Sequence, residues 1–152
     1  MQKMDKTMDL AALEIILKEQ FPDLRGKNGH WDAMTKEGFR FYCLTDTHHD
    51  RMRFMIPVMR LSNPPSAFLF TLLEANFHKA LDANYAVHDG LLWATFVHPL
   101  RSLSHSLARD AVKQVVTLAL NTGTSYSSGS LVFMGGSKEA AKHKEGLRLT
   151  QE

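Results

Sequence analysis

The densest group of residues that could do chemistry is His48-His49-Asp50, which offers two imidazoles and a carboxylate. Neighbouring side chains on an extended segment point apart, and no ligand spacing typical of a metal site accompanies them. The serines within residues 102–106 lie beside His105 without the Gly-x-Ser-x-Gly turn of a serine hydrolase, and capping of a helix explains them. We therefore predict no enzymatic activity, no catalytic residue, no bound metal and no cofactor. A metal- or small-molecule-binding protein that uses His48, His49 and Asp50 remains an alternative.

Three other groups of reactive or charged residues have structural explanations. Cys43 lies within an alternating strand pattern, which indicates a buried and inert thiol, and a lone cysteine excludes an internal disulfide. Residues 123–129 lack the Gly-Lys-Ser/Thr ending of a phosphate-binding loop. Arg51, Arg53 and Arg60 alternate with apolar positions, as on a solvated strand face. A nucleic-acid-binding regulator that uses these arginines is a further alternative, but a formal charge of +2 gives it little support, and we expect no nucleic-acid partner.

The secondary structure begins from the dipeptide Asp89-Gly90, which predicts a β-hairpin over residues 84–97. Apolar residues alternate on both sides of this dipeptide, and Asp-Gly is favoured where two successive residues need positive φ angles. Alternation also predicts strands over residues 30–35, 39–45 and 51–58, with a loop over 26–29. Helical spacing and capping signals predict a first helix over residues 7–21 and a second that begins at Asn63 or Ser66. A third is predicted to begin at Ser102 or Ser104 and to stop near residues 121–123.

The same patterns predict which residues lie on the same side of each element. The face predicted for the second helix carries Leu69, Leu72, Leu73, Asn76, Phe77 and Ala80. The stripe predicted for the third helix carries Leu107, Ala111, Val115, Leu118 and Ala119. In the strand over residues 51–58, the residues predicted to share one side are Met52, Phe54, Ile56 and Val58.

These elements give the order α-β-β-β-α-β-β-α and an α+β fold, a twisted antiparallel sheet flanked by helices. The chain of 152 residues suits one domain, which we assign to residues 1–136, followed by a C-terminal helix or solvated tail over 137–152. No apolar run approaches the roughly 18 residues that cross a bilayer, and no apolar leader is present at the N-terminus. We therefore expect no membrane association and a cytoplasmic location.

Several predicted strands carry large apolar residues on both faces, although a sheet can bury only one face against its helices. An apolar patch on the surface of a soluble protein usually marks a place where a partner binds. We therefore predict a homodimer, a protein client, or both. The residues predicted to form the partner-binding or dimer interface are Leu69, Leu73 and Phe77 on the second helix and Trp93 and Phe96 on the hairpin.

The segment from Leu72 to Gly136 carries a family resemblance. Its motifs are Leu72-Leu73-Glu74-Ala75-Asn76-Phe77, Ala80-Leu81-Asp82-Ala83, Phe96-Val97-His98-Pro99-Leu100, Gln114-Val115-Val116 and residues 123–129. With the order of elements, these motifs resemble the type III secretion chaperone-like superfamily, and within it the YbjN-domain proteins of cyanobacteria. The motifs cover somewhat under half of the chain, and the N-terminal half agrees in element order.

The resemblance implies a small helix-flanked sheet, often homodimeric, without enzymatic activity. The secretion chaperones bind effector segments over their sheets and helices, and YbjN-like members are described as regulators. The resemblance supplies no catalytic residue that could be carried over. The predicted function is therefore that of a non-enzymatic protein-binding module.

Overall fold

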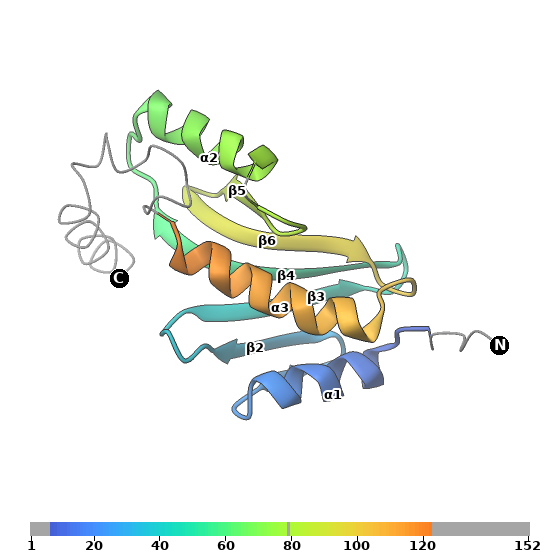
Figure 1. Ribbon diagram of the computed structural model, residues 1–152. Helices are drawn as coiled ribbons and strands as arrows, with labels where there is room; N and C mark the ends of the chain where they lie inside the picture. The colour runs from blue at the N-terminus through green and yellow to red at the C-terminus, as the bar shows by residue number, and fades with distance from the viewer. Residues whose placement is uncertain (1–6, 79, 123–152) are drawn as a thin grey trace.

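The computed structural model describes residues 7–78 and 80–122. Six strands form one sheet, and three helices lie against it or beside its edge (Figure 1). The elements follow in the order α1 (Leu10–Gln20), β1 (Arg25–Lys27), β2 (His30–Met34), β3 (Arg40–Asp46), β4 (Arg51–Arg60), α2 (Ser66–His78), β5 (Asn84–His88), β6 (Leu91–Pro99) and α3 (His105–Leu120). The predicted α+β fold with an antiparallel sheet and flanking helices is confirmed.

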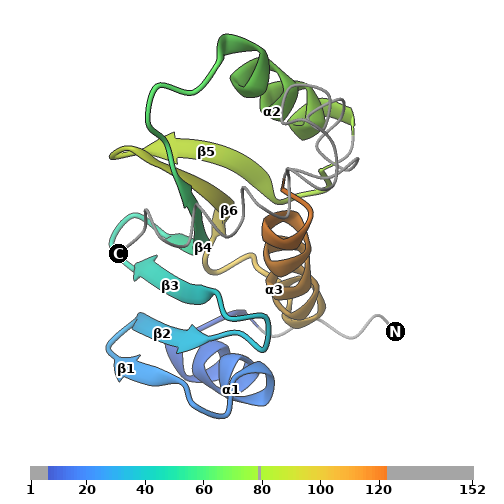
Figure 2. The ribbon, with the colours of Figure 1, turned by 90° about the vertical axis from the view of Figure 1, so that its left-hand side faces the viewer.

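The strands lie in the order β1-β2-β3-β4-β6-β5, and every neighbouring pair is antiparallel. α1 and α3 cover one face of this sheet, and α2 lies beside the β5 edge (Figure 2). Within the described residues, no helix covers the opposite face. Two surfaces are therefore left uncovered by the described helices, the outside of α2 and the second face of the sheet.

One strand was not expected from the sequence. β1 lies in the stretch predicted as a loop, and it pairs with β2 across a turn at Asn28 and Gly29, both of which have positive φ. Three residues with a glycine at the centre are too few to show the alternation that identifies a strand. Pairing with β2 creates this strand, so the sheet has four strands before α2 instead of three.

The hairpin prediction is confirmed. β5 pairs along its whole length with residues 91–95 of β6, and Asp89 and Gly90 between the two strands have φ angles of 54° and 74°. Two successive positive φ angles are those that a type I′ turn requires, and this turn matches the twist of the strands that it joins. The third helix also begins as predicted, because the side chain of Ser104 accepts a hydrogen bond from the backbone of Leu107.

The core lies between the sheet and the helices α1 and α3. A row of phenylalanines crosses it, with ring centroids 4.6 Å apart for Phe21 and Phe41, 5.4 Å for Phe41 and Phe54, and 5.8 Å for Phe54 and Phe96. Offset or tilted rings at such distances attract one another beyond the burial of their area. The buried residues of α3 are Ala108, Ala111, Val112, Val115, Leu118 and Ala119. The predicted stripe is thus confirmed except for Leu107, which is half-buried.

Two predicted faces needed correction. In β4, Val58 was expected to face the core after Ile56, but the register shifts between Pro57 and Met59, and Met59 is buried in its place. A bulge adds one residue and so reverses the alternation beyond it. In α2, the residues of the predicted face do not share one environment: Leu72 is buried with Phe68 and Ala75, whereas Leu73 and Phe77, which were also predicted for the interface, are exposed. Residues 67–70, Leu72 and Leu73 of α2 are all apolar, so apolar side chains surround the helix and periodicity alone did not orient it.

α2 is attached to β5 by an unusual side chain contact. The amide of Asn76 accepts a hydrogen bond from the backbone N–H of Tyr85 (2.7 Å) and donates one to the backbone carbonyl of the same residue (3.1 Å). These two bonds copy the pattern with which a neighbouring strand would pair with Tyr85. At this point the edge of the sheet is therefore occupied by a helix side chain.

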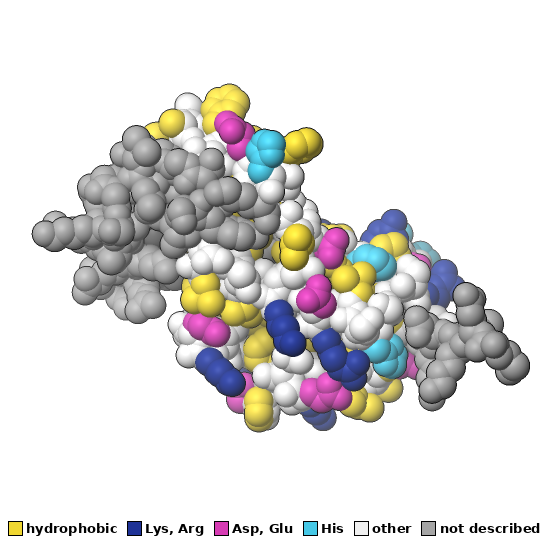
Figure 3. Space-filling view, in the orientation of Figure 1, with side chains coloured by type: hydrophobic (Ala, Val, Ile, Leu, Met, Phe, Trp, Pro, Cys, Tyr) yellow, Lys and Arg dark blue, Asp and Glu magenta, His cyan; other side chains and the backbone are white. Residues whose placement is uncertain are grey.

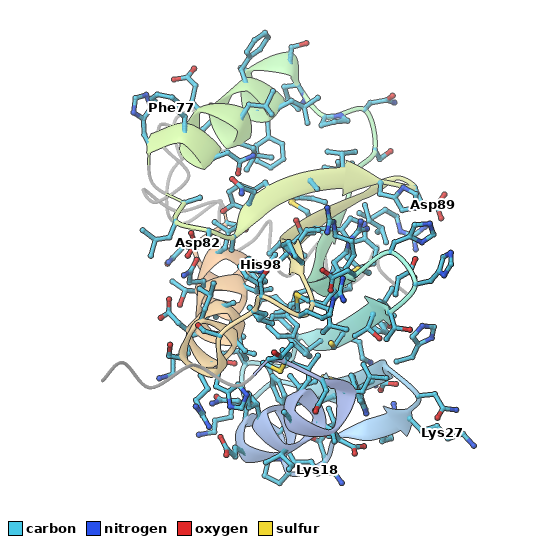
Figure 4. All side chains as sticks on the ribbon, turned by 90° about the vertical axis from the view of Figure 1, so that its right-hand side faces the viewer. Lys18, Lys27, Phe77, Asp82, Asp89 and His98 are labelled. Atoms are coloured by element: carbon cyan, nitrogen blue, oxygen red, sulfur yellow. The ribbon has the colours of Figure 1, made fainter. Side chains whose placement is uncertain are left out.

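The end of α2 is also tied to α3. Gln114 of α3 accepts hydrogen bonds from the backbone N–H groups of Asp82 and Ala83, and it donates to the carboxylate of Asp82. Figure 4 shows Asp82 between the end of α2 and α3.

The predicted domain boundary at residue 136 and the tail over 137–152 lie outside the described residues.

Candidate protein-binding surfaces

The outside of α2 carries a stripe of large apolar side chains, which we call the outer stripe. Its members are Phe70, Leu73, Phe77 and, just after the helix, Leu81, with exposed fractions of 65%, 63%, 84% and 74%. Phe70, Leu73 and Phe77 follow one another at three or four residues, so they lie on one side of the helix. Figure 3 shows hydrophobic side chains gathered over α2, and Figure 4 shows Phe77 at its end. Such a contiguous exposed stripe is typical of a surface that a partner covers.

The second candidate is the face of the sheet away from α1 and α3, which we call the open face. Two rows across the strands define its centre, namely His30, Leu44, Arg53 and Val97 in one row and Asp32, Tyr42, Met55 and Thr95 in the next. Directly opposed residues of antiparallel strands point to the same side. Leu44 is 38% exposed and Val97 is 51% exposed, whereas Met55 and Tyr42 are half-buried. The expected apolar residues on both faces of the sheet are therefore present.

The five residues predicted for the interface separate in the structure. Leu73 and Phe77 lie on the outer stripe, and Leu69 is half-buried on the same helix. Trp93 is half-buried and lies on the open face opposite Pro57, with its indole N–H donating to the carbonyl of His88 (3.1 Å). Two different surfaces therefore carry these four residues.

The prediction that Phe96 belongs to the interface is wrong. Its side chain is 2% exposed and packs on Phe54 in the core, so it offers no surface to a partner. The alternation of β6 directs residues 92, 94 and 96 toward the helices and the intervening residues toward the open face. Phe70, Leu81, Leu44 and Val97 are exposed apolar residues that sequence reasoning missed. The i+3 and i+4 spacing from Leu73 and Phe77 is the signal that would have found Phe70 and Leu81.

The histidine-rich turn between β3 and β4 is a structural turn. Nδ1 of His49 lies 2.7 Å from Oδ2 of Asp46, and this hydrogen bond, with one from the His49 backbone, lowers the pKa of Asp46. Asp50 has a φ angle of 53° and accepts a hydrogen bond from the backbone N–H of Arg101 (2.8 Å). That bond lowers the pKa of Asp50 and ties this turn to the loop before α3. Within residues 7–78 and 80–122, no three His, Cys, Asp or Glu side chains converge as a metal site would need.

The remaining candidates for chemistry have structural roles. Cys43 is fully buried, and burial raises the pKa of its thiol well above the usual range. Its thiolate, the reactive form, is therefore disfavoured. The hydroxyl of Ser104 caps α3, and Nε2 of His105 is buried without a hydrogen-bond partner in the part of the chain that the structure describes. No serine hydroxyl in that part is thus bonded to this imidazole nitrogen.

A shallow cleft of about 670 Å³ lies between the end of α1, α3 and the turn that joins β2 to β3. Its apolar lining includes Phe21, Met34, Val116 and Leu120, and its charged lining includes Lys36, Glu37 and Lys113. Mixed charges around an apolar floor give no arrangement of acid, base and nucleophile. The cleft therefore offers an apolar surface bordered by charges of both signs.

Comparison with known proteins finds similar folds among solved structures. No protein-family model matches the sequence, and no curated protein is detectably similar to it. Among solved structures, the chain is similar to the HopA1-SchA chaperone-effector complex, with a TM-score of 0.53 and 14% identity over 75% of this chain and 96% of that chain. It is also similar to the Yersinia pestis type III secretion chaperone SycH in complex with a fragment of YscM2, with a TM-score of 0.56 and 13% identity over 74% and 97% of the two chains.

A third similar structure is the ExsC-ExsE complex, with a TM-score of 0.56 and 15% identity over 74% of this chain and 92% of that chain. At such identities the likeness concerns the fold. The protein therefore has the α+β fold of the type III secretion chaperones. None of the helices in the described ranges 7–78 and 80–122 is long and apolar enough to cross a membrane.

Proposed function

We propose that this protein is a non-enzymatic binding module that forms a homodimer through the outer stripe of α2 and holds a protein client. The observation that carries the proposal is the outer stripe, four large apolar side chains that are each 63–84% exposed. Burying one such side chain contributes about 2 kcal/mol, so water is an unfavourable environment for all four. A two-fold axis would bring two identical stripes together and cover both at once.

The fold supports a protein client. The similar structures are a chaperone with an effector, a chaperone with a fragment of another protein, and a complex of two proteins. We extend this behaviour to the present chain because the same arrangement of sheet and helices leaves broad surfaces uncovered. The proposal includes a cytoplasmic location and kinship with the YbjN-domain proteins, whose members are described as regulators.

The geometry of α2 favours association through the helix over pairing of strands. Asn76 already occupies both backbone groups of Tyr85 on the free edge of β5. A strand from a second copy would have to displace this amide to extend the sheet at that position. Packing of helices requires no such displacement.

The test is the molar mass in solution. We expect light scattering on a size-exclusion column at tens of micromolar to give twice the protomer mass of 17.2 kDa. Leu73→Asp should shift the mass to that of the protomer, because each dimer loses two leucine side chains that the proposed interface would bury. The loss is about 4 kcal/mol, or about 1,000-fold in the dissociation constant.

Ile15→Asp is the matched control. Ile15 is 62% exposed on α1, nearly the same as Leu73 at 63%, but it lies away from the outer stripe. This variant should remain dimeric. A protomer mass for the unaltered chain, or equal effects of the two variants, would contradict dimerisation through α2.

A further inference from the structure

The open face of the sheet has an excess of positive charge that the helical side lacks. Its alternating positions carry six basic side chains, namely Arg25, Lys27, Arg40, Arg51, Arg53 and Arg60. The same positions carry two acidic ones, Asp32 and Asp46. By contrast, α1 and α3 together carry three basic and three acidic residues, and basic and acidic side chains mix over α3 in Figure 3. The whole chain has a formal charge of only +2, so the positive charge is concentrated on this face.

Much of this charge is not neutralised. Arg25 and Arg40 share one carboxylate, that of Asp32, at 2.7 Å and 3.2 Å. The side chains of Arg53 and Arg60 are exposed and make no ion pair or hydrogen bond with another described residue. These two guanidinium groups retain all five donors for an external anion.

Apolar side chains lie between these charges. Arg53 lies between Leu44 and Val97 in one row across the strands, and the exposed fractions of these neighbours are 38% and 51%. The adjacent row supplies Met55 and Tyr42. A ligand that matches this surface must present carboxylates and apolar groups at the spacing of neighbouring side chains.

On the basis of the proposed function, we propose that the open face binds a segment of a client protein in which Asp or Glu residues alternate with Leu, Val or aromatic residues. Charge complementarity selects the acidic residues, and the patch around Arg53 accommodates the apolar ones. The arginines bind carboxylates in a bidentate manner that lysine cannot match.

Other occupants fit this face less well. A second copy would place like charges against each other, which is unfavourable. Residues 1–6 carry two basic and one acidic residue, and residues 123–152 carry four basic and three acidic ones, so neither end of this chain supplies the anionic partner. Nucleic acid would also satisfy the arginines, and the open face carries two aromatic rings, those of Tyr42 and Trp93. Both rings are half-buried, however, and the immediate neighbours of Arg53 are the aliphatic Leu44 and Val97, which suit an apolar peptide side chain better than a base.

The experiment measures binding of the full chain to fluorescein-labelled 16-residue peptides by anisotropy. The probes are a peptide of alternating Glu and Leu/Phe, the same peptide with Lys for Glu, the same peptide with Ser for Leu/Phe, and a single-stranded DNA of 16 nucleotides. We expect the acidic apolar peptide to bind at least about 10-fold more tightly than each other probe, and its binding to weaken as salt is raised.

The decisive variant is Arg53→Glu/Arg60→Glu. The control is Lys18→Glu/Lys113→Glu on α1 and α3, which changes the net charge by the same amount away from the open face. The double variant should weaken binding of the acidic peptide at least about 10-fold, and the control less than about 2-fold. Circular dichroism checks that the variants are folded. Equal binding by the double variant and the unaltered chain would overturn the inference, as would tighter binding of the DNA.

A displayed library of random 16-residue peptides separates this inference from the proposed function. Binders enriched in Asp and Glu that depend on Arg53 and Arg60 support both. Binders without acidic enrichment overturn the inference and leave the binding module intact. No binder at all, together with a protomer mass in solution, overturns both.

Discussion

Removal of the amide of Asn76 gives the sharpest test of how α2 is held. Its side chain makes two hydrogen bonds with the backbone of Tyr85, of 2.7 Å and 3.1 Å, in a partly buried setting. Each such bond contributes about 1 kcal/mol net, and Asn76→Ala leaves both backbone groups of Tyr85 without this partner. We therefore expect the free energy of unfolding to fall by about 2 kcal/mol.

Asn84→Ala is the matched control. Asn84 is exposed and donates one hydrogen bond of 3.2 Å to the carbonyl of Asp82. The same truncation there should change the free energy of unfolding by less than about 0.5 kcal/mol. Urea denaturation of both variants, under conditions where the oligomeric state is the same, gives the comparison.

Hydrogen exchange provides a local measurement. The amide of Tyr85 donates to Asn76 in the native protein, so its exchange should accelerate about 30-fold in the Asn76→Ala variant if about 2 kcal/mol of local protection is lost. The exchange rates of the α3 amides should rise by no more than the loss of global stability accounts for. Equal urea midpoints for the two variants, or an unchanged exchange rate at Tyr85, would refute the view that Asn76 holds α2 on the sheet edge.

Two further predictions concern the turns. Gly26→Ala should destabilise the fold far more than Gly90→Ala, although both glycines have positive φ. A Cβ at Gly26 would collide with the carbonyl oxygen of His30, whereas a Cβ at Gly90 would meet no atom within 4 Å. Thermal melts compare them, with about 1 kcal/mol expected for Gly90→Ala, and a smaller loss for Gly26→Ala would contradict the pairing of β1 with β2. The hydrogen bond from the backbone of Arg101 lowers the pKa of Asp50. The ionised carboxylate of Asp50 therefore stabilises the fold at pH values above its ordinary pKa of 3.8, and this stabilisation is lost as the pH falls through the lowered pKa. Asp50→Asn should make stability less dependent on pH below about 4, and urea midpoints that keep the same pH slope in this variant would show that the bond is unimportant.

The two proposed surfaces have different functions, dimerisation and client binding, and the difference can be tested. The outer stripe is apolar without charged members, which suits a permanent contact between identical chains. The open face combines arginines with apolar side chains, which suits recognition of a different protein. Variants on α2 should therefore change the molar mass, and variants of Arg53 should change client binding.

Local signals in the sequence determined most of the secondary structure. Asp89-Gly90 identified the hairpin, because few other residue pairs adopt two successive positive φ angles at little cost. Ser104 identified the start of α3, and the spacing of Ala111, Val115 and Leu118 identified the side that packs on the sheet. These features depend on neighbours within a few residues of one another, which is why the sequence alone reveals them.

Tertiary contacts decided the rest. The apolar positions of α2 surround the helix, so only docking on β5 through Asn76 determined that Phe68 and Leu72 are buried and that Phe77 is exposed. The pleat of β6 directed Phe96 into the core and Val97 toward the open face, a distinction that depends on the register with β4. The concentration of arginines on one face likewise follows from the register in which the strands β1 to β4 pair. Periodicity shows that an element has two sides, and only its packing against other elements determines which side stays in water.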